Sequence, residues 1–191
     1  MRRIFWGLIF VFFNLNINLG NSTISFLPAF VGYALIVSGM KQVPCGAYMI
    51  GRTWACVGTV YNAVFWVLNC LGIINYLSSM GLFAVSFTLA GTILQLGTLH
   101  WITKGICELE ETEERTLSGD RLKNTWVALL VCAIAALVTS LLGLAVIAAV
   151  GHIASFIAMI CYLVRFHASR KEYEGRPEKT EEDNYEPSDH F

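Results

Sequence analysis

Few residues in this 191-residue chain are of a type that could do chemistry. Two histidines, His100 and His152, lie within or near apolar sequence, where an imidazole pair could bind a metal ion or relay protons. Neither histidine has a second ligand three or four positions away. We therefore expect each imidazole to be buried singly and hydrogen-bonded, and we predict no metal site, no cofactor and no catalytic residue.

Amide side chains form a more distinctive set of polar residues inside apolar sequence. At helical spacing Asn14 would share a face with Asn18, and Asn62 with Asn69. Gln95 lies in a later apolar stretch. Together with the two histidines, these five amides are the candidate polar positions inside the membrane.

A polar stripe surrounds the last of these amides. Thr88, Thr92 and Gln95 recur at i, i+4 and i+7, so a helix would place them on one face. Such a stripe either lines a path for a small neutral or zwitterionic solute or joins helices by hydrogen bonds. Small residues at helical spacing favour the joining role: Ala128, Cys132, Ala136 and Ser140, then Gly151 and Ser155.

One string resembles a catalytic motif. Residues Glu110 to Arg115 read EETEER and match EExxxR, a signature of membrane proteases that process prenylated or peptide substrates. The companion motifs FxxxH and HxxxN are absent, because leucine or alanine stands four positions before each of His100, His152 and His167. A run this rich in glutamate produces the match by chance, and we predict that the protein is not an enzyme.

The charged residues divide the chain into apolar blocks and polar segments. Apolar residues make up 55% of the chain and charged residues 14%, whereas about 25% are charged in a typical soluble domain. Positions 4–40, 53–103 and 124–164 contain no charged residue. Because ionised side chains avoid hydrocarbon, this distribution predicts an all-α integral membrane protein.

We predict about six transmembrane helices arranged as three hairpins, with the second helix short. The transmembrane domain should cover residues 1–167 and be followed by a disordered acidic cytoplasmic tail, 168–191. A cytoplasmic loop is expected at 104–123, where ten of twenty residues are charged. The spans are expected at about 4–19, 28–42, 53–75, 80–103, 126–141 and 144–165.

The second span is unusual because it should begin near Pro28 and end near Gln42. Fifteen residues at 1.5 Å per residue reach about 22 Å, less than the ~30 Å hydrocarbon layer. This segment therefore thins the bilayer, continues into extended backbone at 24–27, or enters the bilayer and returns.

The basic residues predict the sidedness of the chain. With six spans all thirteen Lys and Arg residues fall on one side, which should be the cytoplasm, with both termini inside. With a re-entrant second segment, Arg2 and Arg3 would lie opposite the other eleven. The six-span arrangement agrees better with the rule that basic residues lie on the cytoplasmic side. It also places four tryptophans at the inner membrane boundary: Trp6, Trp54, Trp101 and Trp126.

The remaining composition limits the partners. A net charge of −1 gives no polybasic signal for nucleic acid or anionic lipid. Six scattered cysteines indicate reduced thiols instead of a disulfide or zinc framework. The expected partners are the lipid bilayer and a cytoplasmic or membrane protein, and nucleic acid is excluded.

Residues 27–33 read LPAFVGY and are followed by Gly39 and Met40. With the basic start and the aromatic first span, this segment resembles a group of small, uncharacterised polytopic bacterial membrane proteins, whose version usually reads LPDFVGY. The likeness covers residues 1–42, and Ala29 stands where the family has the acid. The resemblance implies a bacterial cytoplasmic (inner) membrane protein and brings no activity with it.

Three functions are compatible with these features. The neutral spans, small-residue faces and acidic tail favour a membrane-embedded interaction or regulatory subunit. The amide stripe and the short second span favour small-solute permeation or transport, not driven by carboxylates because the spans contain none. An intramembrane enzyme would require His100 and His152 to converge.

Overall fold

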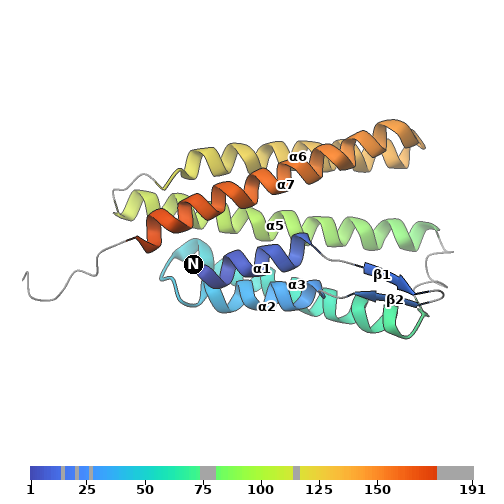
Figure 1. Cartoon of the computed structure of the whole chain (residues 1–191), viewed down its shortest axis with the longest axis horizontal. Coiled ribbons are helices and arrows are strands. Elements are labelled where there is room, and N and C mark those ends of the chain that lie inside the picture. Colours follow the sequence, from blue (N-terminus) through green and yellow to red (C-terminus); the bar gives the residue numbers. More distant parts are fainter. Residues whose placement is uncertain (14–15, 20–21, 26–27, 74–80, 114–116, 176–191) are drawn as a thin grey trace, which may run out of the picture.

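The chain forms a bundle of helices in the computed structural model, which describes residues 1–13, 16–19, 22–25, 28–73, 81–113 and 117–175. These residues contain six helices and one two-stranded antiparallel sheet (Figure 1). In chain order the elements are α1 (Arg2–Phe12), β1 (Asn16–Leu19), β2 (Ser22–Ser25), α2 (Ala29–Met40), α3 (Gly46–Cys70), α5 (Gly81–Glu113), α6 (Gly119–Leu141) and α7 (Ala145–Glu174).

The helices pack as three consecutive hairpins. α1 pairs with α2, α3 with α5, and α6 with α7, and further contacts between α2 and α3 and between α5 and α6 join the pairs. α7 also contacts α1, so the six helices close into a ring. The six predicted helices are found and pack in chain order; that all six cross a membrane as three hairpins stays a prediction.

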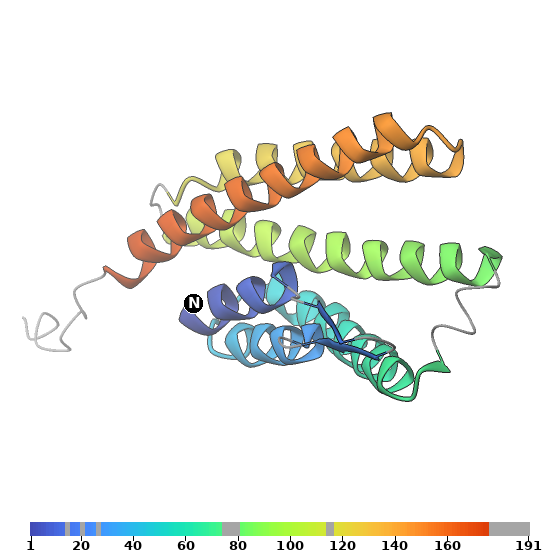
Figure 2. The same cartoon turned by 45° about the vertical axis from the view of Figure 1, so that its right-hand side comes forward.

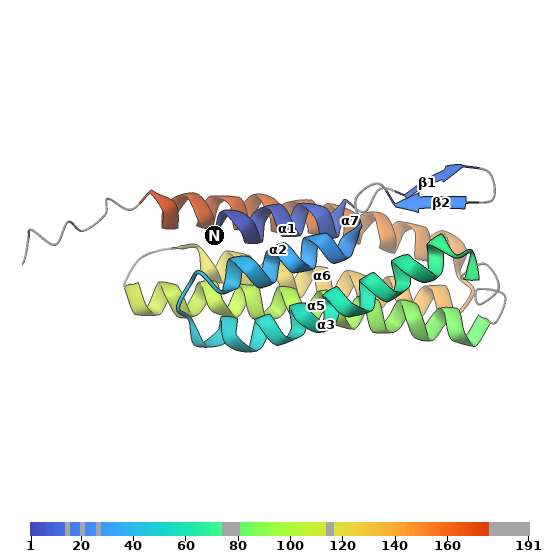
Figure 3. The same cartoon turned by 90° about the horizontal axis from the view of Figure 1, so that it is seen from below.

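The two ends of the bundle differ in chemistry, and we call them the charged end and the apolar end. The charged end holds the start of α1, the α2–α3 connection (41–45), the end of α5, the start of α6 and the end of α7 (Figures 1 and 3). The apolar end holds the β1–β2 hairpin, the end of α3, the start of α5 and the α6–α7 turn (142–144).

Three of the described helices are long and apolar enough to cross a membrane, which is consistent with a membrane protein. They are α5 from Val85, α6 and α7. α1 and α2 contain 11 and 12 residues, so they reach only about 17 and 18 Å along their axes. α3 has 25 residues and is not among the three.

The first predicted span is wrong in its second half, because α1 ends at Phe12 and does not continue to Leu19. Asn16–Leu19 forms a strand that pairs with Ser22–Ser25, with Leu19 opposite Ser22. From Asn14 to Leu19 polar and apolar residues alternate strictly, which is the period of a strand, and asparagine is a weak helix former. Strand β2 (Ser22–Ser25) covers the first two residues of the extended segment 24–27 that was one of the three alternatives for the short second span, and residues 26–27 lie outside the described residues.

The second helix begins and ends close to the prediction. Pro28 precedes its first residue with φ −66°, and the helix ends at Met40. Glycines allow α1 and α2 to approach closely, because a Cβ on Gly7 would lie 2.6 Å from the Gly32 carbonyl oxygen and one on Gly32 2.7 Å from that of Gly7. Gly32 belongs to the LPAFVGY segment, so this part of the segment has a packing role.

The prediction of a loop at 104–123 is wrong over most of its length, because α5 continues to Glu113 and α6 begins at Gly119. Glutamate, lysine and leucine are good helix formers, so a helix can leave the hydrocarbon without ending. For the same reason α7 continues to Glu174, and residues 168–174 of the predicted disordered tail are helical. Residues 176–191 of that tail lie outside the described residues.

The other boundaries are closer to those predicted. α3 begins seven residues before the predicted Thr53, in a segment that a carboxylate from α5 caps, and it ends at Cys70 shortly before Gly72 (φ +72°). α6 ends at Leu141, and Gly143 (φ +72°) forms the predicted turn to α7. Glycine favours these turns because the left-handed conformation costs it little.

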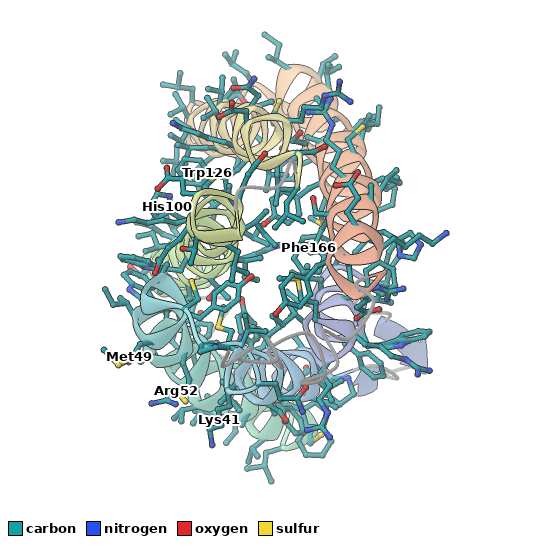
Figure 4. The ribbon with its side chains drawn as sticks, turned by 90° about the vertical axis from the view of Figure 1, so that its left-hand side faces the viewer. Lys41, Met49, Arg52, His100, Trp126 and Phe166 are labelled. Carbon is teal, nitrogen blue, oxygen red and sulfur yellow. The ribbon has the colours of Figure 1, made fainter. Side chains whose placement is uncertain are left out.

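The buried core lies towards the charged end. Its largest fully buried side chains include Tyr48, Leu99, Tyr162 and Phe166, and Figure 4 shows Phe166 directed into the interior of the ring. Towards the apolar end, large aliphatic side chains are exposed along four helices: Val60, Val64, Leu89, Ile93, Val131, Ile134, Val146, Ile153 and Ile157 are among them. Such a belt suits contact with lipid.

Candidate functional site: a cavity between three apolar helices

A cavity of about 410 Å³ lies between the three helices that are apolar enough to cross a membrane. α5 contributes Val85, Thr88, Thr92, Gln95 and Leu96; α6 contributes Leu129, Ala133, Ala136, Leu137, Ser140 and Leu141; α7 contributes His152, Ser155 and Met159. Ligand sites of small molecules have volumes of about 300–1,000 Å³ and combine an apolar lining with a few polar groups. This cavity has both properties.

Hydrogen bonds hold the three helices together at the inner limit of the cavity. The indole Nε1–H of Trp126 in α6 donates to the Leu96 carbonyl oxygen of α5 at 3.1 Å. The Tyr162 hydroxyl of α7 donates to the Leu99 carbonyl at 3.2 Å and lies 3.0 Å from the Thr103 hydroxyl. Figure 2 shows α5 separating from the α6–α7 pair towards the apolar end, and the cavity occupies this divergence.

Small residues keep α6 and α7 in contact beside the cavity. A Cβ on Gly151 would lie 3.1 Å from the Cα and Cβ atoms of Ala136, so the two helices meet here at close range. The predicted small-residue contact between these helices is therefore confirmed at this pair. Since α6 and α7 remain together, the open volume lies between them and α5.

The hydroxyl groups of the lining already donate their protons to their own helices. Thr92 Oγ1 donates to the Thr88 carbonyl at 2.9 Å, Ser140 Oγ to Ala136 at 2.7 Å, and Ser155 Oγ to Gly151 at 2.9 Å. A hydroxyl oxygen that donates its proton keeps its lone pairs as acceptors. These groups therefore offer hydrogen-bond acceptors to the cavity.

His152 offers an acceptor as well. Its Nδ1 lies 2.7 Å from the Ala148 carbonyl oxygen, and because a carbonyl can only accept, Nδ1 carries the proton. In the neutral ring Nε2 is then an acceptor. Gln95 offers both a donor and an acceptor, since its amide forms no hydrogen bond within the described part of the chain.

The cavity is closed towards the charged end. Leu99 and Ile102 of α5 and Tyr162 of α7 are at most 1% exposed and fill the bundle beyond Leu96. On the other side the lining reaches Val85 and Leu141, near the start of α5 and the end of α6.

The structure separates the residues that the sequence marks as polar candidates. Gln95 and His152 line the cavity, and the predicted stripe with Thr88 and Thr92 is confirmed there. Asn62 and Asn69 belong to α3 instead, and Asn62 Nδ2 donates to the Gly58 carbonyl of its own helix at 2.8 Å. The amide of α5 therefore lines the cavity, and the two amides of α3 do not.

The other three candidates lie elsewhere or outside the described side chains. His100 packs between aromatic rings, with ring centroids 4.8 Å from Trp126 and 5.5 Å from Trp101, and Figure 4 places His100 beside Trp126. Asn18 belongs to strand β1, whose side chains are not described, and Asn14 lies outside the described residues. His100 and His152 thus have separate surroundings.

The glutamate-rich string has a structural role that the motif match did not predict. Glu110 Oε2 accepts the backbone N–H of Gly119 at 2.7 Å, at the start of α6. Arg115 lies outside the described residues. Within the described residues no three His, Cys, Asp or Glu side chains are grouped so that they could hold a metal ion.

Sequence reasoning missed two groups of residues. Ser140 and Ser155 were assigned only to helix packing, yet they also line the cavity, and their position opposite the Thr88–Gln95 stripe was not visible without the helix pairing. Glu108 was assigned to a loop. Its carboxylate accepts the backbone N–H groups of Gly46 at 2.8 Å and Ala47 at 2.9 Å and so caps α3 from α5.

Comparisons with protein-family models, with curated proteins and with solved structures found no match to this chain.

Proposed function

We propose that this protein is a multi-pass membrane protein that binds a small neutral molecule in the cavity between α5, α6 and α7, as a step of permeation or transport. The observation that carries the proposal is the convergence of six polar side chains on one cavity among the three helices that are long and apolar enough to cross a membrane. The lining contains no Asp, Glu, Lys or Arg. Coupling to ions through intramembrane carboxylates is therefore not part of the proposal.

The hydrogen-bonding state of the lining favours one class of ligand. Thr92, Ser140, Ser155 and His152 present acceptors, and the Gln95 amide adds two N–H donors and a carbonyl acceptor. A ligand that donates several hydrogen bonds, such as an alcohol or an amide, complements this lining. A buried polar group without a partner costs about 1–3 kcal/mol, so ligands that satisfy these groups are selected.

The topology we propose has six crossings with both termini on the cytoplasmic side of the inner membrane. It is supported by the common location of all described charged segments at one end of the bundle. It requires α1 and α2, each too short to span as a helix, to cross together with the extended backbone of β1 and β2. Cysteines introduced at Glu111 and Lys171 should both react with an impermeant maleimide only from the cytoplasmic face.

Solute flux tests the function. Purified protein is reconstituted into vesicles, and glycerol and urea uptake is followed by stopped-flow light scattering. We expect uptake above that of empty vesicles, and we expect Gln95→Leu to reduce it to the background while Asn62→Leu, an amide outside the cavity, leaves it unchanged. Equal uptake by protein-containing and empty vesicles would contradict the proposal that the protein conducts glycerol or urea.

A second candidate is the interaction or regulatory subunit predicted from the sequence. The observation that favours it is the exposed polar surface where α5, α6 and α7 reach the charged end, which includes Glu111, Asp120, Arg121, Lys171 and Glu172. A partner that binds there should be lost from a mild-detergent preparation when Arg121 and Lys171 are changed to Glu. Retention of the same partner by that variant contradicts this candidate.

A further inference from the structure

The polar side chains of the cavity form a row along the direction of the helices. On α5 Thr88, Thr92 and Gln95 line the cavity at intervals of four and three residues. At 1.5 Å per residue this part of the row is about 10 Å long. His152 and Ser155 of α7 add polar groups to a second wall of the cavity. A ligand in the cavity therefore meets a hydrogen-bonding group at each turn of α5.

Exposure and packing give this row an inner and an outer end. Gln95 is half-buried and is adjacent in sequence to the residue whose carbonyl oxygen accepts the Trp126 indole N–H. His152 is exposed and directly follows Gly151, which meets Ala136 of α6. Ala136 lies ten residues after Trp126 on α6, about 15 Å further towards the apolar end. Gln95 is therefore at the inner end of the row, and His152 is towards the outer end.

The third wall of the cavity is apolar. All lining residues of α6 except Ser140 have aliphatic side chains: Leu129, Ala133, Ala136, Leu137 and Leu141. None of the described residues that line the cavity is aromatic, so the lining has no flat ring on which a sugar ring could stack. A matching ligand directs its polar groups towards α5 and α7 and its C–H groups towards α6.

The row contains more acceptors than donors. The Thr92 and Ser155 hydroxyls donate their protons to their own helices, and the His152 Nδ1 proton is bound to the Ala148 carbonyl oxygen. These three side chains present acceptors to the cavity, and the N–H donors come from the Gln95 amide. The ligand should therefore accept a hydrogen bond at the inner end and donate along the rest of the row. A hydroxyl group does both, whereas a carbonyl or ether oxygen accepts and cannot donate.

The length of the row decides how long such a ligand is. In an extended chain successive atoms advance by about 1.25 Å, so the terminal oxygens of glycerol lie about 5 Å apart and those of a six-carbon polyol about 9 Å apart. Glycerol therefore reaches part of the row. A chain of five or six carbons follows most of it, from Gln95 towards the level of Thr88.

We propose that the cavity binds a linear polyol of five or six carbons, with one end at Gln95 and the other end at His152. The hydroxyls between them donate to Thr92 and Ser155, and the C–H groups face α6. A cyclic sugar of the same size directs its hydroxyls around the whole ring, so some of them would be buried against α6 without a partner. This inference rests on the proposed function, because it names the ligand class of the same cavity.

The test measures binding and does not depend on flux. Purified protein in detergent is titrated with D-mannitol, glycerol or D-glucose, and the dissociation constants are measured by saturation-transfer difference NMR. We expect mannitol to bind about tenfold more tightly than glycerol, because its additional hydroxyls form further hydrogen bonds. Glucose, which has the same number of carbons in a ring, should bind no more tightly than glycerol.

Variants test the two ends of the row separately. Gln95→Leu should weaken the binding of both mannitol and glycerol. His152→Leu should lower the preference for mannitol over glycerol about fivefold, and His152→Gln, which restores an acceptor, should keep most of it. Asn62→Leu removes an amide outside the cavity and should change neither dissociation constant.

The outcomes separate this inference from the proposed function. Equal affinity for mannitol and glycerol, or an unchanged preference in His152→Leu, overturns the linear polyol, while binding of glycerol that depends on Gln95 would still support the cavity as a ligand site. Binding of glucose as tight as that of mannitol overturns the linear form of the ligand. Absence of binding by all three probes overturns this inference and, together with absent urea uptake, the proposed function.

Discussion

Helix α5 passes through two different environments, and the exposure of its side chains differs between them. Near the charged end Leu99 and Ile102 are 1% and 0% exposed, whereas Leu89 and Ile93, two to three turns earlier, are 39% and 50% exposed. In α7 Phe166 is fully buried, but the outer face of this helix is exposed near both ends, since Ile153 is 61% and Val164 63% exposed. The charged end is thus a packed core, and the apolar end is a set of helices whose outer faces need lipid.

Polar interactions divide in the same way. At the charged end they join different helices: Glu108 caps α3 from α5, Trp126 binds α5 from α6, and Tyr162 binds α5 from α7. Towards the apolar end the Tyr61 hydroxyl of α3 donates to the Phe87 carbonyl oxygen of α5 at 2.6 Å. The cavity hydroxyls of Thr92 and Ser155 bond instead to the backbone of their own helices. The comparison teaches that hydrogen bonds join α5 to α6 and α7 at the charged end, whereas the same three helices leave room for a ligand towards the apolar end.

The largest effect should come from adding one methyl group to α5 at each end. A Cβ on Gly105 would overlap the Tyr48 ring, whereas one on Gly91 would lie 3.5 Å from the nearest Tyr61 atom, an ordinary contact. We expect Gly105→Ala to lower the free energy of unfolding by about 3 kcal/mol through overpacking. Gly91→Ala should leave it unchanged or raise it by up to about 1 kcal/mol, because alanine favours the helix.

Thermal unfolding of both variants in the same detergent, followed by near-UV circular dichroism, measures this difference. The contrast between the two ends is lost if Gly91→Ala is as destabilising as Gly105→Ala.

The sequence predicts the helices better than their ends. The uncharged stretches locate α2, α6 and the α6–α7 turn because Pro28 and Gly143 mark their limits. The prediction from sequence is wrong where a charged segment was interpreted as the end of a helix. At the end of α5 the helix continues through charged residues to Glu113. The prediction is also wrong in residues 14–19, where the alternation of asparagine with apolar residues, followed by Gly20 and Asn21, is itself a hairpin signal.

A second, smaller effect should follow from removing the carboxylate that joins α5 to α3. Glu108→Ala leaves the N–H groups of Gly46 and Ala47 without their acceptor, and Cys45 gives α3 no cap of its own. We expect a loss of about 1–2 kcal/mol in the free energy of unfolding. Glu111→Ala removes an exposed carboxylate on the next turn of α5 and should cost less than about 0.5 kcal/mol.

Amide hydrogen exchange measures both the position and the size of this effect. In Glu108→Ala the first turn of α3 should exchange faster, while the amides around Gln95 should keep their rates. Faster exchange throughout α5 would mean that the two ends are not independent, and would weaken the comparison.

The cavity shows which part of a site a sequence can supply. Thr88, Thr92 and Gln95 belong to one helix, so their common face follows from spacing alone. The contribution of Ser140 and His152 depends on how α6 and α7 turn about their axes when they pack, and this is decided by contacts such as Gly151 with Ala136. Asn62 has the same local signal as Gln95, but its amide bonds to its own helix backbone and does not line the cavity.

The smallest effect should separate two buried tyrosines of the charged end. The Tyr162 hydroxyl bonds to Leu99 and lies within bonding distance of Thr103, whereas the Tyr48 hydroxyl is buried without a partner among the described residues. Tyr162→Phe should therefore cost about 1 kcal/mol, and Tyr48→Phe should cost nothing or stabilise the protein slightly, because it removes an unsatisfied group.

These two substitutions delete the same atom from the same residue type, so their difference measures the hydrogen bonds and not the loss of volume. Both melting midpoints are measured under the conditions used for Gly105→Ala and Gly91→Ala. An equal loss in the two variants would indicate that a water molecule satisfies Tyr48. Buried water would then contribute hydrogen bonds to the core at the charged end. The contrast with the apolar end would depend on side-chain packing alone.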